Sequence, residues 1–391
     1  MAEAVATGVK RVYFHVGAPK TGTTYLQQVL FQNRKALAGN GVLYPYARFG
    51  DSFRSAVDFV GEGWGSKPAR SFAGSWDEVA TRAREWTGST VIVSNELLGG
   101  ASADRVAARL QELGPAEVHV VFTARDLARQ LVSDWQEHVK HKHTVPLEQF
   151  VGDLVERGFD APEPFGRMFW GLHDPVHVLG RWAPAVPPAN VHVVTVPQPG
   201  APADTLWRRF CAVTGLDPES YQTSVRRANR SMGVAETELL RRMNADLRSL
   251  RDDLYSTLVR VHLAERVLGG RSARLTLPPQ YLPWVTERSR EMVRDLADAG
   301  YRVEGDLAEL LPVAEQHLDH VSPTDLSEAD LAPAAVRAAS GMVQHSARQR
   351  ERLELLEAGR DPDSPRERAR AALARGRAPV GRLLRRVGLR R

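Results

Sequence analysis

The sequence lacks several features that mark whole classes of protein. Its 391 residues include one cysteine, Cys211, so no disulfide can form within one chain. No segment approaches the roughly 18 consecutive apolar residues that a membrane-spanning helix needs. Residues 1–10 contain no apolar core of a secretion signal. These absences lead us to expect a soluble, cytoplasmic protein whose single thiol stays in a reducing compartment.

Patterns typical of nucleic-acid binding are also missing, although the chain carries a net charge of +5. Residues 365–391 contain ten arginines and one glutamate, a local net charge of +9, which leaves residues 1–364 at −4. The positive charge therefore belongs to a C-terminal tail, and the body of the protein is mildly acidic. No zinc-knuckle, RNP or basic-zipper pattern accompanies it. We expect no nucleic-acid partner for the folded body.

Four short apolar segments rich in Val, Ile and Phe predict β-strands at residues 11–17, 90–94, 117–124 and 190–196. Their hydrophobicity is nearly continuous rather than alternating, which is typical of parallel strands covered on both faces. Predicted helices separate them, so the sequence indicates an α/β fold with right-handed crossovers. Ligands of such sheets bind at the carboxyl ends of the strands. The loops that follow the strands are therefore where chemistry is expected.

The predicted domain organisation is one α/β domain at residues 1–312 with a mainly helical C-terminal extension. Residues 44–75 are rich in Gly, Phe and Trp without a period, which predicts an irregular insert that could serve as an acceptor loop. Residues 313–361 are expected to form appended helices split by prolines, Pro333 among them. Residues 362–391 are the arginine-rich tail.

The strongest functional pattern is Gly17-Ala18-Pro19-Lys20-Thr21-Gly22-Thr23-Thr24, between the first predicted strand and the first predicted helix. A loop of this kind directs backbone N–H groups and a helix N-terminus at one spot, which binds anions. The glycines allow close backbone approach, the threonines add hydroxyl donors, and the lysine supplies a positive charge. We therefore predict a phosphate site in this loop.

The loop differs from the Walker A pattern, in which the lysine directly follows the second glycine. Here Thr23 occupies that position, and Lys20 lies three residues earlier. No predicted strand ends in a convincing Mg²⁺-holding aspartate, since Glu96 and Arg125-Asp126 follow the two strands concerned. These differences disfavour an ATPase or GTPase, and they leave a P-loop small-molecule kinase as an alternative function.

The segment Pro19-Lys20-Thr21-Gly22-Thr23-Thr24, continued by Tyr25-Leu26-Gln27, resembles the donor-binding loop of bacterial sulfotransferases that use 3′-phosphoadenosine 5′-phosphosulfate (PAPS). In that family the lysine contacts the oxygen between phosphate and sulfate, and the loop amides and threonines hold the 5′-phosphate. The resemblance implies a P-loop NTPase-like parallel β-sheet flanked by helices, PAPS as the co-substrate and no metal. It assigns donor binding to Gly17, Lys20, Thr21, Gly22, Thr23 and Thr24, and a catalytic role to Lys20.

The same resemblance extends to the 3′-phosphate of the donor. In the family an arginine at a strand end and a serine eight residues later bind this group. Arg125 follows the third predicted strand, and Ser133 lies eight residues on, in a helix that Asp126 is expected to cap. An arginine fork can bind two phosphate oxygens at once. Arg125 and Ser133 are thus implied as 3′-phosphate ligands, with a salt bridge at the helix start as the alternative for Arg125.

Sulfuryl transfer also needs a base that takes the proton of the acceptor. Glu96 is the leading candidate, because family members carry a histidine or a glutamate after the corresponding strand. Its alternatives are to cap the following turn or to pair with an arginine. His15 is more typical of a structural hydrogen-bonding group. The dense histidines 138, 141 and 143 are expected to face solvent or the acceptor cleft rather than a metal.

Two later segments also resemble the family. Residues 229–231, Asn-Arg-Ser, are similar to a segment that precedes a helix in bacterial members and could help close the nucleotide site. An ordinary helix start is the alternative. Residues 301–307 contain the closing V-x-G-D-L signature, which we interpret as structural. The resemblance thus covers residues 11–312 in scattered motifs.

The acceptor is not evident from the sequence, and a glycan, a lipid and a small metabolite are all open, as is the oligomeric state. Phe49, Phe53, Trp64 and Trp76 could form a platform for it, or they could pack in the interior. The tail could contact an anionic inner membrane surface or be disordered. The sequence therefore predicts a PAPS-dependent sulfotransferase, with a kinase or a non-enzymatic nucleotide-binding, membrane-associated scaffold as alternatives.

Overall fold

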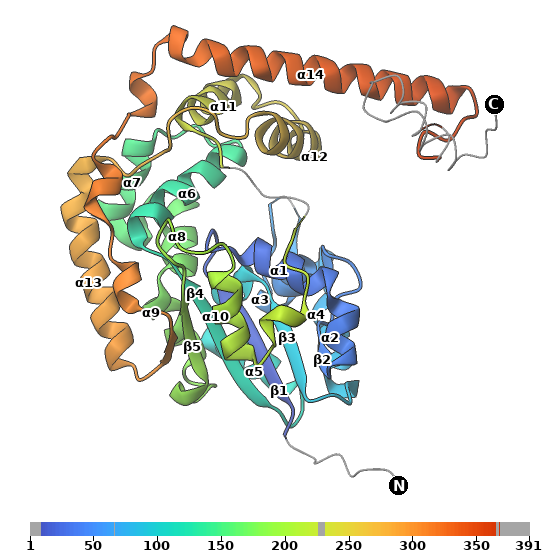
Figure 1. Cartoon of the computed structure of the whole chain (residues 1–391), viewed down its shortest axis with the longest axis vertical. Coiled ribbons are helices and arrows are strands. Elements are labelled where there is room, and N and C mark those ends of the chain that lie inside the picture. The colour runs from blue at the N-terminus through green and yellow to red at the C-terminus, as the bar shows by residue number, and fades with distance from the viewer. Residues whose placement is uncertain (1–8, 66, 226–230, 365–366, 368–391) are drawn as a thin grey trace.

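The computed structural model, which describes residues 9–65, 67–225, 231–364 and 367, contains a six-stranded parallel sheet flanked by helices (Figure 1). The strands lie in the order β2-β3-β1-β4-β5-β6. Their bounds are Arg11–Gly17 (β1), Val42–Leu43 (β2), Thr90–Ser94 (β3), Glu117–Ala124 (β4), Val191–Thr195 (β5) and Arg302–Glu304 (β6). The predicted α/β class and all four predicted strands are confirmed. Among the strands that the structure describes, the two short edge strands β2 and β6 were missed.

Helices cover both faces of this sheet and form a first hydrophobic core with it. They are α1 (Thr23–Gln32), α2 (Arg34–Gly39), α3 (Asp51–Val60), α4 (Ser75–Glu85), α5 (Ala103–Gln111), α9 (Pro175–Trp182) and α10 (Thr205–Thr214). The strands contribute their Val, Ile and Phe side chains to this core, which is why their sequences read as continuous apolar segments. The first core fixes the positions of the loops at the sheet's carboxyl edge.

A second hydrophobic core lies within a helical assembly that lies above and to the left of the strands in Figure 1. Its helices are α6 (Leu127–Lys140), α7 (Leu147–Arg157), α8 (Phe165–His173), α11 (Val234–Asp246), α12 (Asp252–Leu254), a π-helix (Tyr255–Val267), α13 (Leu282–Asp298) and α14 (Glu328–Glu357). Helices α6, α7 and α8 lie between β4 and β5 in the sequence, whereas the other helices of the assembly follow β5. The assembly therefore combines a segment from the middle of the sequence with the C-terminal extension.

The prediction of an irregular insert at residues 44–75 is wrong, because α3 and part of α4 lie within it. The apolar residues Phe53, Ala56, Val57 and Val60 follow helical spacing. Gly61, with φ of 81°, then ends the helix in a left-handed conformation. Glycines and aromatic residues on either side concealed this short period in the sequence.

The expected split of the appended helices at Pro333 is also wrong, since α14 runs unbroken through this proline. Ser327 and Asp330 form a capping box at the start of the helix, and α14 packs against α11. The loss of one backbone hydrogen bond near the helix start is therefore tolerated. Residues 365–366 and 368–391 of the arginine-rich tail lie outside the described residues. Among the helices that are described, none has the length and hydropathy to cross a bilayer.

The V-x-G-D-L signature has the structural role that we predicted. Its valine lies in β6, which pairs with β5. Gly305 follows with φ of 113°, and the Asp306 N–H donates to Thr195 Oγ1 at 3.2 Å. A Cβ atom on Gly305 would lie 2.0 Å from that same hydroxyl oxygen. The glycine therefore allows the chain to turn directly against the end of β5.

The Gly305→Ala variant is expected to lower the free energy of unfolding by more than about 1 kcal/mol, because it combines a left-handed backbone with a steric clash. Gly300→Ala is the matched control, since Gly300 also has a positive φ but nothing within 4 Å of its Cβ position. Urea unfolding of both variants measures the difference. Equal losses for the two would contradict the role given to the close contact with Thr195.

Candidate functional site

The glycine-rich loop lies between β1 and α1 at the carboxyl edge of the sheet. Because β1 is paired with β3 on one side and β4 on the other, the segments that follow these two strands flank the loop. Glu96 follows β3 and Arg125 follows β4. The structure thus brings the predicted donor loop, the predicted base and the predicted 3′-phosphate ligand to one edge.

The loop is fixed by one hydrogen bond to β4 and one within the loop, while most of its backbone N–H groups stay free. The Ala18 N–H donates to Thr123 O at 2.7 Å, and the Thr21 hydroxyl donates to Ala18 O at 2.6 Å. Within the described part of the chain, no hydrogen-bond acceptor faces the backbone N–H groups of residues 20–25. Gly22, in a left-handed conformation, starts α1 without a side-chain cap. A helix N-terminus with several unpaired donors favours an anion.

Lys20 is held at both its backbone and its side chain. Its φ of 64° is uncommon for a residue other than glycine. Arg125 Nη1 donates to the Lys20 carbonyl oxygen at 3.0 Å. The Lys20 ammonium group contacts Glu137 Oε2 at 2.7 Å, and both side chains are 27% exposed. Glu137 was missed as a site residue, although it lies four residues after Ser133 and therefore on the same face of α6.

Glu137 lies among nitrogen-bearing side chains, two of them lysines. Lys140 Nζ lies 3.4 Å from its Oε2, and His141 Nε2 lies 3.4 Å from its Oε1. Burial acts to raise the pKa of Glu137, but Lys20, His141 and Lys140 together hold that pKa well below its usual value. Glu137 therefore stays ionised near neutral pH and is a weak proton acceptor.

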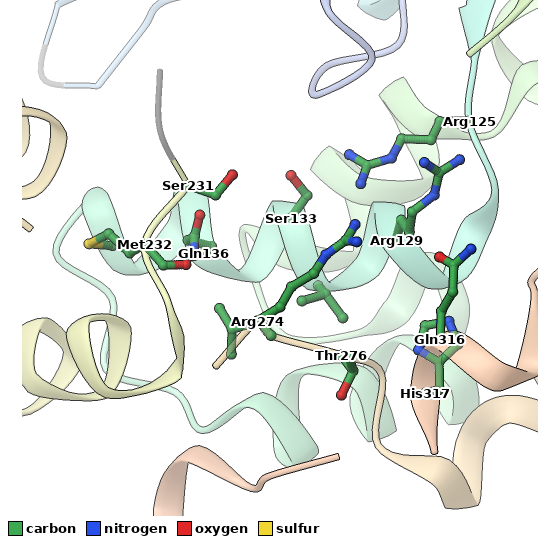
Figure 2. Close-up of a pocket in the computed structure, with 12 residues that line it drawn as sticks. Arg125, Arg129, Ser133, Gln136, Ser231, Met232, Arg274, Thr276, Gln316 and His317 are labelled. Atoms are coloured by element: carbon green, nitrogen blue, oxygen red, sulfur yellow. Dashed lines mark hydrogen bonds between the residues drawn. The ribbon is translucent and has the colours of Figure 1, made fainter. Parts of the chain in front are cut away.

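Beside the loop lies a cavity of about 90 Å³ whose wall contains Arg125, Arg129, Arg274 and Ser133. Figure 2 shows the three guanidinium groups and the Ser133 hydroxyl around one open space. No carboxylate is among its described lining residues. The predicted pair, Arg125 and Ser133, thus lies on one wall of a strongly cationic pocket. Arg129 and Arg274 were missed.

The contacts of Asp126 bear on the alternative role of Arg125, a salt bridge at the helix start. Asp126 caps α6, accepting the Arg129 N–H at 2.9 Å, and its other oxygen contacts Arg129 Nε. The predicted cap is therefore confirmed, and the salt bridge at the helix start belongs to Arg129 rather than Arg125. Burial, then the charge of Arg129, lowers the pKa of Arg125 to about 10. A bound anion would offset this unfavourable concentration of positive charge.

Arg129 and Arg274 have spare hydrogen-bonding capacity toward this pocket. The Nη2 atom of Arg129 is buried without a hydrogen-bond partner. Arg274 comes from the segment between the π-helix and α13, and none of the described residues forms a salt bridge with it. Ser231 also lines the pocket, whereas residues 229 and 230 of the predicted Asn-Arg-Ser segment lie outside the described residues. The pocket therefore offers more donors than the sequence indicated.

Glu96 lies in a short 3₁₀-helix, Glu96–Gly100, and accepts a hydrogen bond from Gln27 Nε2 of α1 at 2.9 Å. Asn95, not Glu96, caps this turn by accepting the Leu97 N–H at 3.0 Å. In the described structure Glu96 has no arginine partner. Neither alternative role for Glu96 is therefore realised, and its carboxylate lies beside the loop helix with a neutral partner.

The histidines divide between structural and peripheral positions. His15 is buried, and its ring contacts Ser94 Oγ at 2.8 Å and Thr123 Oγ1 at 3.2 Å. Burial lowers the pKa of His15 to about 4, so it stays neutral, and the structural role predicted for it is confirmed. The solvent or cleft position predicted for the other histidines is wrong for His138, which is buried against Phe165 in the second core.

The aromatic residues considered as an acceptor platform are likewise divided. Trp76 is fully buried, and its Nε1 donates to Glu112 at 2.6 Å, so it belongs to the first core. Phe53 packs edge to face with Trp64 at 5.6 Å between ring centroids. Phe49 and Trp64 remain 39% and 36% exposed. The structure thus excludes Trp76 from such a platform and leaves the outer aromatic residues accessible.

The chain matches no protein-family model and no curated protein. Among solved structures, it is similar to the crystal structure of a sulfotransferase from Alicyclobacillus acidocaldarius, with 17% sequence identity and a TM-score of 0.38. The similarity covers 61% of this chain and 94% of the other. A similarity at this level shows nothing about the chemistry of this chain.

Proposed function

We propose that this protein is a sulfotransferase that moves a sulfuryl group from PAPS to a hydroxyl or amine of an acceptor. The observation that carries the proposal is a side chain that joins the two predicted anion sites. Arg125 lines the cationic pocket and also donates to the Lys20 carbonyl oxygen of the loop at 3.0 Å. A nucleotide with phosphate groups on both its 5′ and 3′ oxygens matches such a pair. ATP, which lacks a 3′-phosphate, would leave the arginine pocket without a ligand.

In this proposal the loop holds the 5′ end of the donor and the pocket holds its 3′-phosphate. The free N–H groups of residues 20–24 and the hydroxyl groups of Thr23 and Thr24 bind the 5′-phosphate, with Gly17 and Gly22 allowing close approach. Thr21 contributes only its N–H, because its hydroxyl donates within the loop. Arg125 and Ser133 bind the 3′-phosphate, and the guanidinium groups of Arg129 and Arg274 add positive charge.

Two residues act in the transfer step, one on the leaving group and one on the acceptor. The acceptor oxygen or nitrogen attacks sulfur while the bond between sulfur and the 5′-phosphate oxygen breaks. Lys20 stabilises the negative charge that develops on this leaving oxygen. Glu96 takes the proton that the acceptor loses. The products are the sulfated acceptor and 3′-phosphoadenosine 5′-phosphate (PAP).

Lys20 has to exchange its partner when the donor binds, because its ammonium group contacts Glu137 in the structure. Lys140 and His141 stay beside Glu137 after this exchange. The carboxylate therefore keeps compensating charge, which lowers the cost of releasing Lys20.

The proposed activity can be tested by supplying PAPS in the presence of EDTA with a panel of glycan, lipid and small hydroxylated acceptors, and measuring PAP release. We expect at least one acceptor to raise PAP formation clearly above the rate without acceptor. A parallel assay supplies ATP and Mg²⁺ with the same panel. Phosphorylation of an acceptor from ATP, without any use of PAPS, would contradict the proposal and favour the kinase.

The Glu96→Gln variant is expected to lower kcat by about 100-fold or more, because general-base catalysis typically contributes at least this much. PAP affinity should stay within about twofold, since this residue lies outside the donor's phosphate sites in our proposal. Glu85→Gln is the matched control, because Glu85 is exposed at the end of α4. Steady-state kinetics at saturating PAPS measures both. Unchanged kcat in Glu96→Gln would remove this residue from the role of base.

A further inference from the structure

Helix α6 carries two adjacent polar stripes with different surroundings. Arg129 and Ser133 line the cationic pocket, and Glu137 contacts Lys20 of the loop. Gln130, Asp134 and His138 repeat at the same four-residue interval, and all three are buried. Three polar side chains on the buried face of one helix need compensating hydrogen bonds, because unpaired polar groups are costly to bury.

The buried stripe is linked to α8 through His173. The Gln130 side-chain amide contacts both the Pro19 carbonyl oxygen of the loop and His173 Nδ1. Because a carbonyl oxygen can only accept, the amide nitrogen of Gln130 faces the loop and donates to both groups. His173 Nδ1 is therefore an acceptor. Its proton is on Nε2, which donates to Asp134 Oδ1 at 3.1 Å.

Asp134 keeps its charge and orients the far end of this chain of contacts. Burial acts to raise the pKa of Asp134, but His173 and His138 outweigh it and hold that pKa well below its usual value. His138 Nε2 lies 3.2 Å from the second carboxylate oxygen. The sequence of contacts thus runs from Asp134 through His173 and Gln130 to the loop. Asp134, His173 and Gln130 are all buried.

The contact with Pro19 matters because it bears on the backbone of Lys20. The Pro19 carbonyl belongs to the peptide plane before the Lys20 Cα atom, and the Lys20 carbonyl belongs to the plane after it. Gln130 donates to the first and Arg125 to the second. Two hydrogen bonds therefore fix both peptide planes of a residue whose φ of 64° is otherwise uncommon.

We propose that His173 is a positioning residue that acts through Gln130 to hold the Pro19–Lys20 peptide plane, and thereby directs Lys20 and the neighbouring N–H groups at the 5′ end of the donor. The inference rests on the proposed function, because it assigns the loop to the donor's 5′-phosphate. It extends that function to α8, whose residues touch neither anion site directly. A histidine that only packs in the core would affect the loop and the arginine pocket alike.

The test compares two ligands in the full chain by calorimetric titration: PAP, which reaches both sites, and adenosine 3′-phosphate, which lacks the 5′-phosphate. In His173→Ala we expect PAP affinity to fall about tenfold, the size of one lost buried hydrogen bond. Affinity for adenosine 3′-phosphate should stay within about twofold. His173→Asn keeps an acceptor near the position of Nδ1 and should recover most of the loss. His177→Ala, on α9, is the control that should change neither affinity.

The outcomes separate this inference from the proposed function. If His173→Ala loses affinity equally for both ligands, or for neither, the positioning role is overturned. The proposed function still stands in that case, provided that the wild-type protein binds PAP more tightly than ADP. If the wild-type protein binds PAP no better than ADP, the proposed function fails instead. If His173→Ala does not fold, Gln130→Leu can be titrated with the same two ligands instead. This substitution removes the contact with Pro19 and leaves the rest of the helix unchanged. We expect the same selective loss of PAP affinity there.

Discussion

Replacing Lys20 with alanine is expected to lower kcat for sulfuryl transfer by about 100-fold or more, while PAP affinity falls less than about fivefold. Removal of one group that stabilises developing charge typically costs 100- to 1000-fold in rate. In the proposal that charge develops on the leaving oxygen only as the sulfur–oxygen bond breaks, so the loss appears mainly in the transition state. Calorimetry with PAP and single-turnover PAP release from PAPS measure the two quantities.

Lys35→Ala is the matched control for this prediction, because Lys35 is an exposed lysine on α2. It should change neither quantity. The remaining partners of Glu137, Lys140 and His141, keep that carboxylate paired in the Lys20 variant, so misfolding is not expected. Equal losses in affinity and rate for Lys20→Ala would contradict the catalytic role and make Lys20 a binding residue only.

The Arg125→Ala variant should show the opposite distribution of effects. Hydrogen bonds to charged groups are worth about 1.5–3 kcal/mol, so PAP affinity is expected to fall about 10- to 100-fold. Affinity for ADP should change far less, because ADP carries no 3′-phosphate. Turnover at saturating PAPS should stay within about tenfold, the remaining loss arising from the missing hydrogen bond to the Lys20 carbonyl.

Two further variants test the role of Arg125 in binding PAP. Arg125→Lys keeps the charge but loses the planar fork, so it should recover only part of the PAP affinity. Arg290→Ala, at an exposed position of α13, should leave binding unchanged. A variant at position 125 that binds PAP like wild type but loses turnover would contradict the assignment, because it would place Arg125 in the chemical step.

Much of the fold could be predicted because its signals are local. Continuous apolar segments predicted the four long strands, and Asp126 predicted the start of α6. Arg125 and Ser133 are eight residues apart, which is about two helical turns. A helix that starts directly after the strand was therefore expected to bring them to the same side, and both line the cationic pocket. β2 and β6, with two and three residues, are too short to produce a period.

The rest of the site depends on contacts between segments that are far apart in the chain. A single sequence does not indicate which residues of such segments meet. Lys20 and Glu137 are 117 residues apart, and Arg274 enters the pocket from beyond the π-helix. His138 was misjudged because the dense charges around it suggested solvent, whereas its four-residue spacing from Asp134 places it on the buried stripe. The acceptor also stayed undefined, since exposed aromatic residues such as Phe49 and Trp64 fit several chemical classes.

The most direct test of the proposed donor is a calorimetric titration of the wild-type protein with PAP and with ADP, both without Mg²⁺. The two nucleotides differ by the 3′-phosphate that the arginine pocket is proposed to bind. We predict that PAP binds at least about tenfold more tightly than ADP, as expected for a phosphate held by charged hydrogen bonds. Equal affinities, or tighter binding of ADP, would contradict the assignment of PAPS as the donor and make the kinase the leading alternative.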